Sequence, residues 1–555
     1  VYAQDVWSLT PNFRLTYGLR LDMPIYMNSL DSNKSIEELA FVNNTHVDIS
    51  KWPKTQVLFS PRVGFNWDVK GDRSVIVSGG TGIFTGLLPF VWFTNQPSNS
   101  GLYQNMVEYN TQKNPGSLPA DFGFNPNYRE TLQKYPSLFP STPSEQAPDV
   151  IAYVDPKFKM PQVWRSNLNV DIQLPYDFML SVGAMYTRDI YNVAQLNMNE
   201  AEPTGVYNEQ PDRIYWASKK YEYNDYTNGK NVVVKLSNGE DKGYQYSFNA
   251  ILTKKYDFGF TGSIGYTYTM AKDLTANPGS APNSAWQNNV AVNSLNDPGV
   301  SYSLFSTPHR IIANASYEIN YAKCLKTTFS LFYSGYHTGR YSYTYYNDMN
   351  GDGNYSDLIY VPNSQDEMTF VDITDKSGAI TYSAVDQAKD FWDFVNNDSY
   401  LKDRKGKYVE RNGSLTPWIN RFDFKIAQDF YATLGGRKYG IQVSLDMLNV
   451  GNMINSKWGA YQSCGLKSYD NVQLLKTASK VGEPLTYQIN ANSREAFKER
   501  SSWQYTNTIG SAWYGRSCFR IIIEIAKRRK TTSSDCSRTF CCKCSRCCIR
   551  CSTYA

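Results

Sequence analysis

Apolar and polar residues alternate with a period of two along most of this chain. In the run 13–22, Phe13, Leu15, Tyr17 and Leu19 are separated by polar residues or glycine. Successive side chains of a strand point to opposite faces, so such a run predicts a strand with one apolar face. Further runs of this kind, about ten residues long, lie at 62–69, 164–174, 244–252, 311–319 and 441–447.

The connections between these runs are alternately short and long. Short connections lie at 10–12, 70–73, 175–177, 254–257, 321–325 and 431–437, and long ones at 23–60, 85–161, 188–242, 272–309, 337–420 and 451–502. This spacing predicts twelve strands in six hairpins and a thirteenth strand near the C-terminus. A meander of such strands, with short turns at one end and long loops at the other, is typical of an outer-membrane barrel.

A barrel also explains how a membrane protein can be polar overall. The mean hydropathy is −0.49, and no stretch approaches the roughly 20 apolar residues of a membrane helix. In a barrel the backbone groups pair between strands, one face meets lipid, and the other meets a water-filled lumen. We therefore expect an all-β fold, a transmembrane antiparallel up-and-down β-barrel of about thirteen strands with long extracellular loops, in the outer membrane of a Gram-negative bacterium.

Two soluble all-β folds, the propeller and the sandwich, are alternatives to the barrel. A propeller repeats at a fixed period of roughly 40 residues, whereas the spacings here are irregular. A soluble sandwich rarely has loops beyond about 15 residues, and this chain has six long ones at one end. Both alternatives fit worse than the barrel.

The sequence offers little support for catalysis. The three histidines, His46, His309 and His337, are isolated from any nucleophile motif. Neither G-x-S-x-G, HExxH nor a phosphate-binding Walker loop is present. We therefore expect a protein that is not an enzyme.

The clearest local motif is acid-rich and lies in the long connection 337–420. Oxygen-bearing side chains recur at alternate positions around two glycines: Asp348, Asn350, Asp352, Asn354 and Asp357. Loops of this D-x-N-x-D-G type can surround a hard cation, so the sequence predicts a Ca²⁺ site. The bidentate Glu of an EF-hand would fall at Ile359, so this is not an EF-hand. The alternative is a solvated, Asx-rich turn.

Two other features of the long loops suggest structure or binding. The segment 384–403 has apolar residues at helical spacing, which predicts a short helix packed within its loop. The tyrosine-rich stretches 341–346 and 221–226 are interpreted as aromatic surfaces that would suit sugars or peptides equally.

Several segments also resemble strands of TonB-dependent outer-membrane receptors. These are VYAQDVW at 1–7, LTYGLRLD at 15–22 and FSPRVGF at 59–65. Four more look like the large Oar-like branch of Bacteroidota type: MPQVWRS at 160–166, STPHR at 306–310, RFD at 421–423 and LNVGN at 448–452. The resemblance covers roughly residues 1–513.

This resemblance implies a 22-stranded barrel plugged by an N-terminal domain. It implies that an inner-membrane TonB complex pulls on the plug to admit a ligand bound by the loops. It also implies large ligands such as peptides, proteins or glycans, and a surface lipoprotein as a partner. Because no plug or TonB box precedes Val1, we expect residues 1–513 to be part of a barrel whose remaining strands lie outside this chain.

The composition changes at Tyr514. From there on the chain carries ten basic and two acidic residues, so the preceding body has a net charge of −3 although the whole chain has +5. Eight of the ten cysteines also lie in this part. Residues 514–525 alternate well enough to form an aberrant last strand, and 526–555 are expected to be a disordered or aberrant tail rich in Cys, Lys and Arg.

Three interpretations of this tail stay open. The pairs Cys544/Cys547 and Cys548/Cys551 have zinc-ligand spacing. The basic run 527–530 would suit nucleic acid or anionic lipid. An aberrant C-terminus without an evolved role is the interpretation we favour, and nucleic acid is not an expected partner.

The function expected from the sequence is energy-coupled import of a large ligand across the outer membrane. The alternative is a surface adhesion or binding protein that holds a partner with its long loops and transports nothing.

Overall fold

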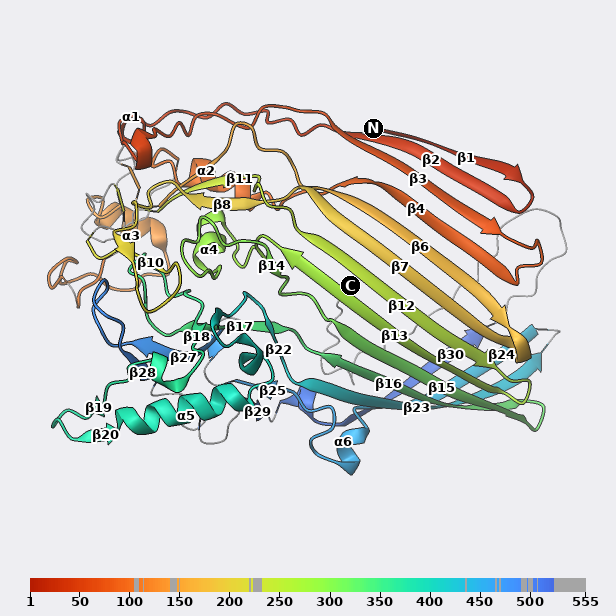
Figure 1. Cartoon of the computed structure of the whole chain (residues 1–555). Coiled ribbons are helices and arrows are strands. Elements are labelled where there is room, and N and C mark those ends of the chain that lie inside the picture. Colours follow the sequence, from red (N-terminus) through yellow and green to blue (C-terminus); the bar gives the residue numbers. More distant parts are fainter. Residues whose placement is uncertain are drawn as a thin grey trace.

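The computed structural model describes residues 1–103, 109–112, 114–139, 147–148, 150–218, 221–222, 232–434, 437–464, 467–468, 471–490, 497, 503–506 and 508–523. Within these ranges one sheet dominates, and its path runs through thirteen long strands (Figure 1). They are β1 (Tyr2–Thr10), β2 (Phe13–Asp22), β3 (Leu58–Asp68), β4 (Val75–Thr85), β6 (Gln162–Leu174), β7 (Phe178–Tyr191), β12 (Tyr244–Lys255), β13 (Phe260–Asp273), β15 (His309–Tyr321), β16 (Leu325–His337), β23 (Trp418–Leu434), β24 (Arg437–Leu448) and β30 (Tyr514–Ile523). The predicted thirteen-strand sheet is therefore confirmed.

The sheet is an up-and-down meander. Each long strand pairs antiparallel with the long strands next to it in the chain, and the described sheet begins at β1 and ends at β30. A short additional strand, β14 (Ser301–Tyr302), pairs with the end of β13. The long connections gather beyond one end of the sheet and the short turns lie at the other end (Figure 1). This arrangement confirms the predicted alternation of short and long connections.

One face of the sheet is apolar across many strands. Strand pairing places a single row of residues side by side from β2 to β15: Phe13, Trp67, Val77, Val170, Val182, Ala250, Tyr266 and Ile311. Side chains in such a row share a face, because the period of a strand is two. This is the face that a membrane barrel turns to lipid.

The opposite face is polar in the same register. The neighbouring row consists of Arg14, Asn66, Ser78, Asn169, Gly183, Asn249, Thr267 and Arg310. Gly183 leaves room here, since a Cβ atom on it would lie 2.6 Å from Oδ1 of Asn169 and 2.8 Å from Nδ2 of Asn249. This face can line a wet lumen, whereas water-free lipid would leave its groups unpaired.

Two hydrogen-bonded polar clusters lie at the two edges of the apolar face between β15 and β23. Near the turn end, Gln428 Oε1 accepts from Tyr321 and Thr327 at 2.9 and 2.5 Å. Near the loop end, Asn420 Oδ1 accepts from Tyr333 Oη at 2.8 Å and from Trp418 Nε1 at 2.9 Å. From Thr327 to Tyr333 the strand rises by about 20 Å, close to the height of a barrel's apolar band.

The long connections form small sheets of their own. Two of these sheets join different connections through parallel pairs, β5 with β11 and β17 with β27. The first consists of β5 (Val150–Val154), β11 (Val232–Ser237) and β8 (Ala194–Asn197). The second consists of β22 (Ser414–Leu415), β17 (Arg340–Tyr345), β27 (Asn471–Thr477), β26 (Lys467–Ser468) and β28 (Tyr487–Ile489). Short pairs complete the set: β9 (Gly205–Val206) with β10 (Ile214–Tyr215), β18 (Tyr360–Val361) with β21 (Lys407–Tyr408), β19 (Ile373–Thr374) with β20 (Ile380–Tyr382), and β25 (Gln462–Ser463) with β29 (Gln504–Tyr505).

The loops also hold the helices, which are α1 (Lys34–Glu37), α2 (Val91–Ser98), α3 (Tyr128–Lys134), α4 (Pro282–Gln287), α5 (Ala384–Asn397) and α6 (Gly451–Ile454). The predicted helix in 384–403 is confirmed by α5, which starts at the N-cap Ser383, whose Oγ accepts from the backbone N–H of Asp386. Its Phe391, Phe394 and Val395 are buried in the largest hydrophobic core, which lies among the loops. No helix in the described ranges is long and apolar enough to cross a membrane.

The tyrosine-rich stretch 341–346 is mostly not a ligand surface. Tyr341, Tyr343 and Tyr345 in β17 are buried in the loop core, so that part of the prediction is wrong. Residues 223–226 of the other stretch lie outside the described ranges. So do residues 524–555, which include the whole predicted tail 526–555, while β30 covers most of the segment 514–525.

Candidate functional site

The acid-rich loop lies between β17 and β18, deep among the extracellular loops. Asn350, Asp352, Asn354 and Asp357 are 0, 4, 7 and 2% exposed. Met349 and Leu358 beside them belong to the main loop core. The loop is therefore packed against protein, which differs from the solvated turn considered as the alternative.

Two glycines let this loop turn tightly around Asp348. The carboxylate of Asp348 accepts from the backbone N–H of Gly351 at 2.7 Å and of Gly353 at 2.9 Å. Both glycines have positive φ, at 84° and 93°, a conformation that side chains disfavour. At Gly351 a Cβ atom would also lie 2.5 Å from the backbone oxygen of Trp216, so the neighbouring connection fits closely over this turn.

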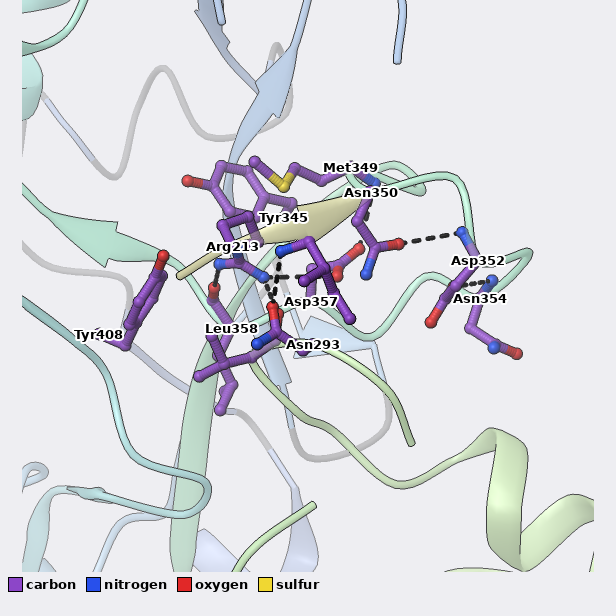
Figure 2. Close-up of polar contacts among 12 residues, drawn as sticks. Arg213, Asn293, Tyr345, Met349, Asn350, Asp352, Asn354, Asp357, Leu358 and Tyr408 are labelled. Atoms are coloured by element: carbon purple, nitrogen blue, oxygen red, sulfur yellow. Dashed lines mark hydrogen bonds and ion pairs between the residues drawn. The ribbon is translucent and has the colours of Figure 1, made fainter. Parts of the chain in front are cut away.

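The alternate Asn and Asp residues continue the same pattern. Oδ1 of Asn350 accepts from the N–H of Asp352 at 3.0 Å, and Oδ1 of Asp352 accepts from the N–H of Asn354 at 2.7 Å (Figure 2). The side-chain Nδ2 atoms of Asn350 and Asn354 are buried without a hydrogen-bond partner within the described structure. A buried polar group without a partner costs free energy. The two amide groups therefore remain able to donate hydrogen bonds.

Asp357 closes the loop and makes an ion pair. Its Oδ2 accepts from the N–H of Met349 at 3.0 Å, and its Oδ1 lies 3.5 Å from Nη1 of Arg213. The side chains of Arg213 and Asp357 are 0 and 3% exposed. Because the two residues come from different long connections, this pair joins them (Figure 2).

Arg213 has several other partners. It donates to Oε1 of Gln210 at 3.1 Å and to the backbone oxygens of Val292 and Leu358. Its guanidinium also lies 4.7 Å from the ring centroid of Tyr408. Arg213 therefore joins its own connection, which also contains Gln210, to the two connections that contain Val292 and Leu358.

Glu200 adds a further, partly buried acid near this loop. Its Oε2 accepts from Oγ of Ser294 at 2.8 Å, while its Oε1 has no partner within the described structure. Burial raises the pKa of Glu200 to about 7. The Glu200 carboxylate is also close enough to Asp352 to raise the pKa of that residue.

Negative charge exceeds positive charge in this region. Burial, followed by the carboxylates of Asp357 and Asp348, raises the pKa of Asp352 well above its usual range. Burial also raises the pKa of Asp357, although Arg213 opposes this shift. Protons or a cation would relieve this repulsion.

The loop brings the five predicted cation ligands together in one turn, but their carboxylates do not converge on one point. No group of three or more His, Cys, Asp or Glu side chains in the described ranges is placed to hold a metal ion. Several of the side-chain oxygens accept backbone N–H groups instead. A Ca²⁺ ion would therefore need some of these side chains to rotate.

Sequence reasoning missed Arg213 and Glu200. Neither has a local signal, because Arg213 reaches residues 79 and 145 positions away in the chain. The Asp–Asn–Gly pattern, by contrast, was visible because its hydrogen bonds are local.

The paired apolar and polar rows, the meander and the one-sided long loops define a transmembrane barrel protein of the outer membrane. Residues 1–460 match the family described as outer membrane beta barrel domain. The chain belongs to this family, and its place is the bacterial outer membrane. No curated protein matches the chain.

Solved structures of outer-membrane transporters are similar at low identity. The outer membrane transporter YddB from Escherichia coli is 11% identical with a TM-score of 0.38, over 92% of this chain and 43% of that one. A mutant of the ferric enterobactin receptor PfeA from Pseudomonas aeruginosa is 9% identical with a TM-score of 0.35, over 81% and 39%. The copper transporter OprC is 9% identical with a TM-score of 0.35, over 88% and 46%. The chain thus spans less than half the length of each of these proteins.

Proposed function

We propose that this chain is part of a TonB-dependent receptor of the Oar-like branch that imports a large ligand, such as a peptide, protein or glycan. The observation that carries the proposal is the continuous polar row on the inner face of the sheet, from Arg14 to Arg310. This row crosses eight strands, so the barrel to which they belong would have a wide polar lumen through which a ligand could pass once the plug opens. The family description names an outer membrane barrel, which is the fold that such a receptor needs.

The proposal includes parts outside this chain. A 22-stranded barrel needs further strands, and energy-coupled opening needs an N-terminal plug that a TonB complex can pull. A surface lipoprotein is the proposed extracellular partner. The six long connections, four of them joined by parallel strand pairs, support this scheme because a large ligand needs a broad and shaped surface.

Uptake measurements distinguish import from adhesion. Cells with the complete receptor gene and cells lacking it would receive a pool of peptides and glycans graded by size, with and without a protonophore. Import predicts that some pool members disappear from the medium only with the gene present, and that the protonophore stops this loss. Surface binding that is unaffected by the protonophore, without internal accumulation, would instead support the adhesin.

We also propose that the acid-rich loop binds Ca²⁺ through Asp348, Asn350, Asp352, Asn354 and Asp357. The excess of buried carboxylates over the single Arg213 guanidinium supports this proposal. Binding would require side-chain rotation that frees the oxygens of Asn350 and Asp352 from the backbone N–H groups whose hydrogen bonds they accept.

A calcium titration of the purified protein, read by calorimetry and melting temperature, tests this site. Asp352→Ala should abolish the heat of binding and the calcium-dependent rise in melting temperature. Asp375→Ala is the matched control, because Asp375 makes similar turn hydrogen bonds to the N–H groups of Ser377 and Ala379 on an exposed hairpin. Equal responses of both variants and the wild type would contradict the proposal.

A further inference from the structure

Part of one long connection lies on the lipid-facing side of the sheet. Tyr333 and Phe422 pair across β16 and β23 and belong to the apolar face, two residues along from Gly335 and Asn420, which continue the row that contains Ile311. Trp458, from the connection after β24, packs on this surface with its ring tilted and its centroid 5.8 Å from that of Phe422. Figure 1 shows α6 projecting sideways beside β23.

This segment, residues 451–460, is a well-formed hook and will be called the α6 hook. Nδ2 of Asn452 donates to the backbone oxygens of Ser456 at 2.7 Å and Trp458 at 3.1 Å. Nδ2 of Asn449 donates to the backbone oxygen of Gly459 at 3.2 Å. The base of the hook is therefore anchored by the buried amide of Asn449, and two exposed hydrogen bonds from Asn452 hold the turn, so the tip has a defined position.

The tip of the α6 hook exposes large apolar side chains. Met453 is 54% exposed and Ile454 is 80% exposed. Between the hook and the sheet is an open cleft of about 370 Å³, lined by Tyr333, Asn420, Phe422 and Trp458. An exposed apolar tip beside an apolar cleft would be unfavourable in water.

We propose that the α6 hook is immersed in the outer leaflet and that its cleft binds an acyl chain of a membrane lipid with an anionic headgroup. The cleft is continuous with the lipid-facing side of the barrel, so lipid already covers its surroundings. The aromatic rings and Asn420 lie at the loop end of the apolar band, the depth at which amphipathic side chains gather in barrels. Lys457, exposed on the same hook, supplies the positive charge for the headgroup.

Hydroxyl-radical footprinting of the purified protein in lipid nanodiscs tests the immersion of the hook. Met453 and Met27 are both exposed in the structure, at 54 and 91%, but Met27 belongs to an extracellular connection. We expect Met453 to be oxidised at least tenfold more slowly than Met27, because lipid excludes the radical. Oxidation of the two residues within a factor of three of each other would overturn the proposal.

Brominated lipids test the cleft itself. Exchange of phosphatidylglycerol for its chain-brominated form should quench a component of tryptophan fluorescence that Trp458→Phe removes. Trp216→Phe is the matched control, since Trp216 is buried among the loops and should leave the quenched intensity unchanged. Lys457→Gln should reduce the difference between brominated phosphatidylglycerol and brominated phosphatidylcholine. Equal quenched intensity in the wild type and Trp458→Phe would overturn the proposal.

Discussion

The guanidinium of Arg213 and the carboxylate of Asp357 lie 3.5 Å apart where neither side chain is more than 3% exposed. They belong to different long connections, so the pair fixes how these connections pack. Removal of one partner leaves the other charge buried and uncompensated, which costs far more than the loss of a surface pair.

Arg213→Met should destabilise the loops by about 3–5 kcal/mol because Asp357 loses its countercharge. The double variant with Asp357→Asn should recover part of this loss. Hydrogen exchange of the loop amides measures both effects. Lys51→Met is the control. Lys51 pairs with Asp48 at 2.7 Å on the surface, with side-chain exposures of 67 and 34%. An exposed pair of this kind contributes only about 0–1 kcal/mol to stability. Similar losses in the two single variants would contradict the buried role of Arg213.

Glu200 should make loop stability depend on pH. Its pKa in the fold is about 7, above that of an unfolded chain, so the fold favours the protonated form. The contribution of Glu200 to the stability of the loops is therefore fully present below about pH 4 and is lost as the pH rises through 7. In chelator-treated buffer, loop melting should fall between pH 5 and pH 8 in the wild type, and Glu200→Gln should reduce this fall. An unchanged slope in Glu200→Gln would contradict the expectation.

An arginine should destabilise the protein at one of two consecutive residues of β12 and be tolerated at the other. Ala250 belongs to the lipid-facing row and Asn249 to the polar row. Ala250→Arg should cost about 2–4 kcal/mol if it lies near the middle of the bilayer, whereas Asn249→Arg meets water. Urea unfolding in lipid vesicles measures the difference. Equal losses in the two variants would mean that the faces are assigned incorrectly.

Gly183 should tolerate no side chain without displacement of its neighbours. A Cβ atom would lie under 3 Å from the side-chain amide groups of Asn169 and Asn249. Because these are the ends of movable side chains, we expect Gly183→Ala to cost about 1 kcal/mol, the low end for overpacking. The same unfolding measurement applies. Gly123→Ala serves as the control because its Cβ atom would have no neighbour within 4 Å. A neutral Gly183→Ala would show that the polar row is loosely packed.

The sheet was predictable from the sequence because each strand is specified by the alternation of its own residues and pairs with its neighbours in the chain. A strand with lipid on one side and water on the other must alternate, and a membrane barrel leaves each strand beside its chain neighbours. The thirteen strands, their order and α5 follow from such patterns. The Asp348–Asp357 turn follows from Asx and glycine chemistry for the same reason.

The loop core was not predictable in this way. All six residues of β17 are buried, so the alternation of Tyr341, Tyr343 and Tyr345 does not separate an inner from an outer face. The strand pairs in parallel with β27, more than a hundred residues later. No local pattern indicates such a partner, and none indicates that Arg213 reaches Asp357.

The parallel pair of β17 and β27 limits how these loops can diversify. Neither connection completes its own sheet, so a change of length or sequence in one alters the fold of the other. A single loop grafted onto another barrel would lose its shape, and the smallest portable unit is the group of connections that share this sheet and Arg213. The ligand preference proposed for this protein should therefore change by exchange of whole loop sets, or by changes confined to their exposed rims.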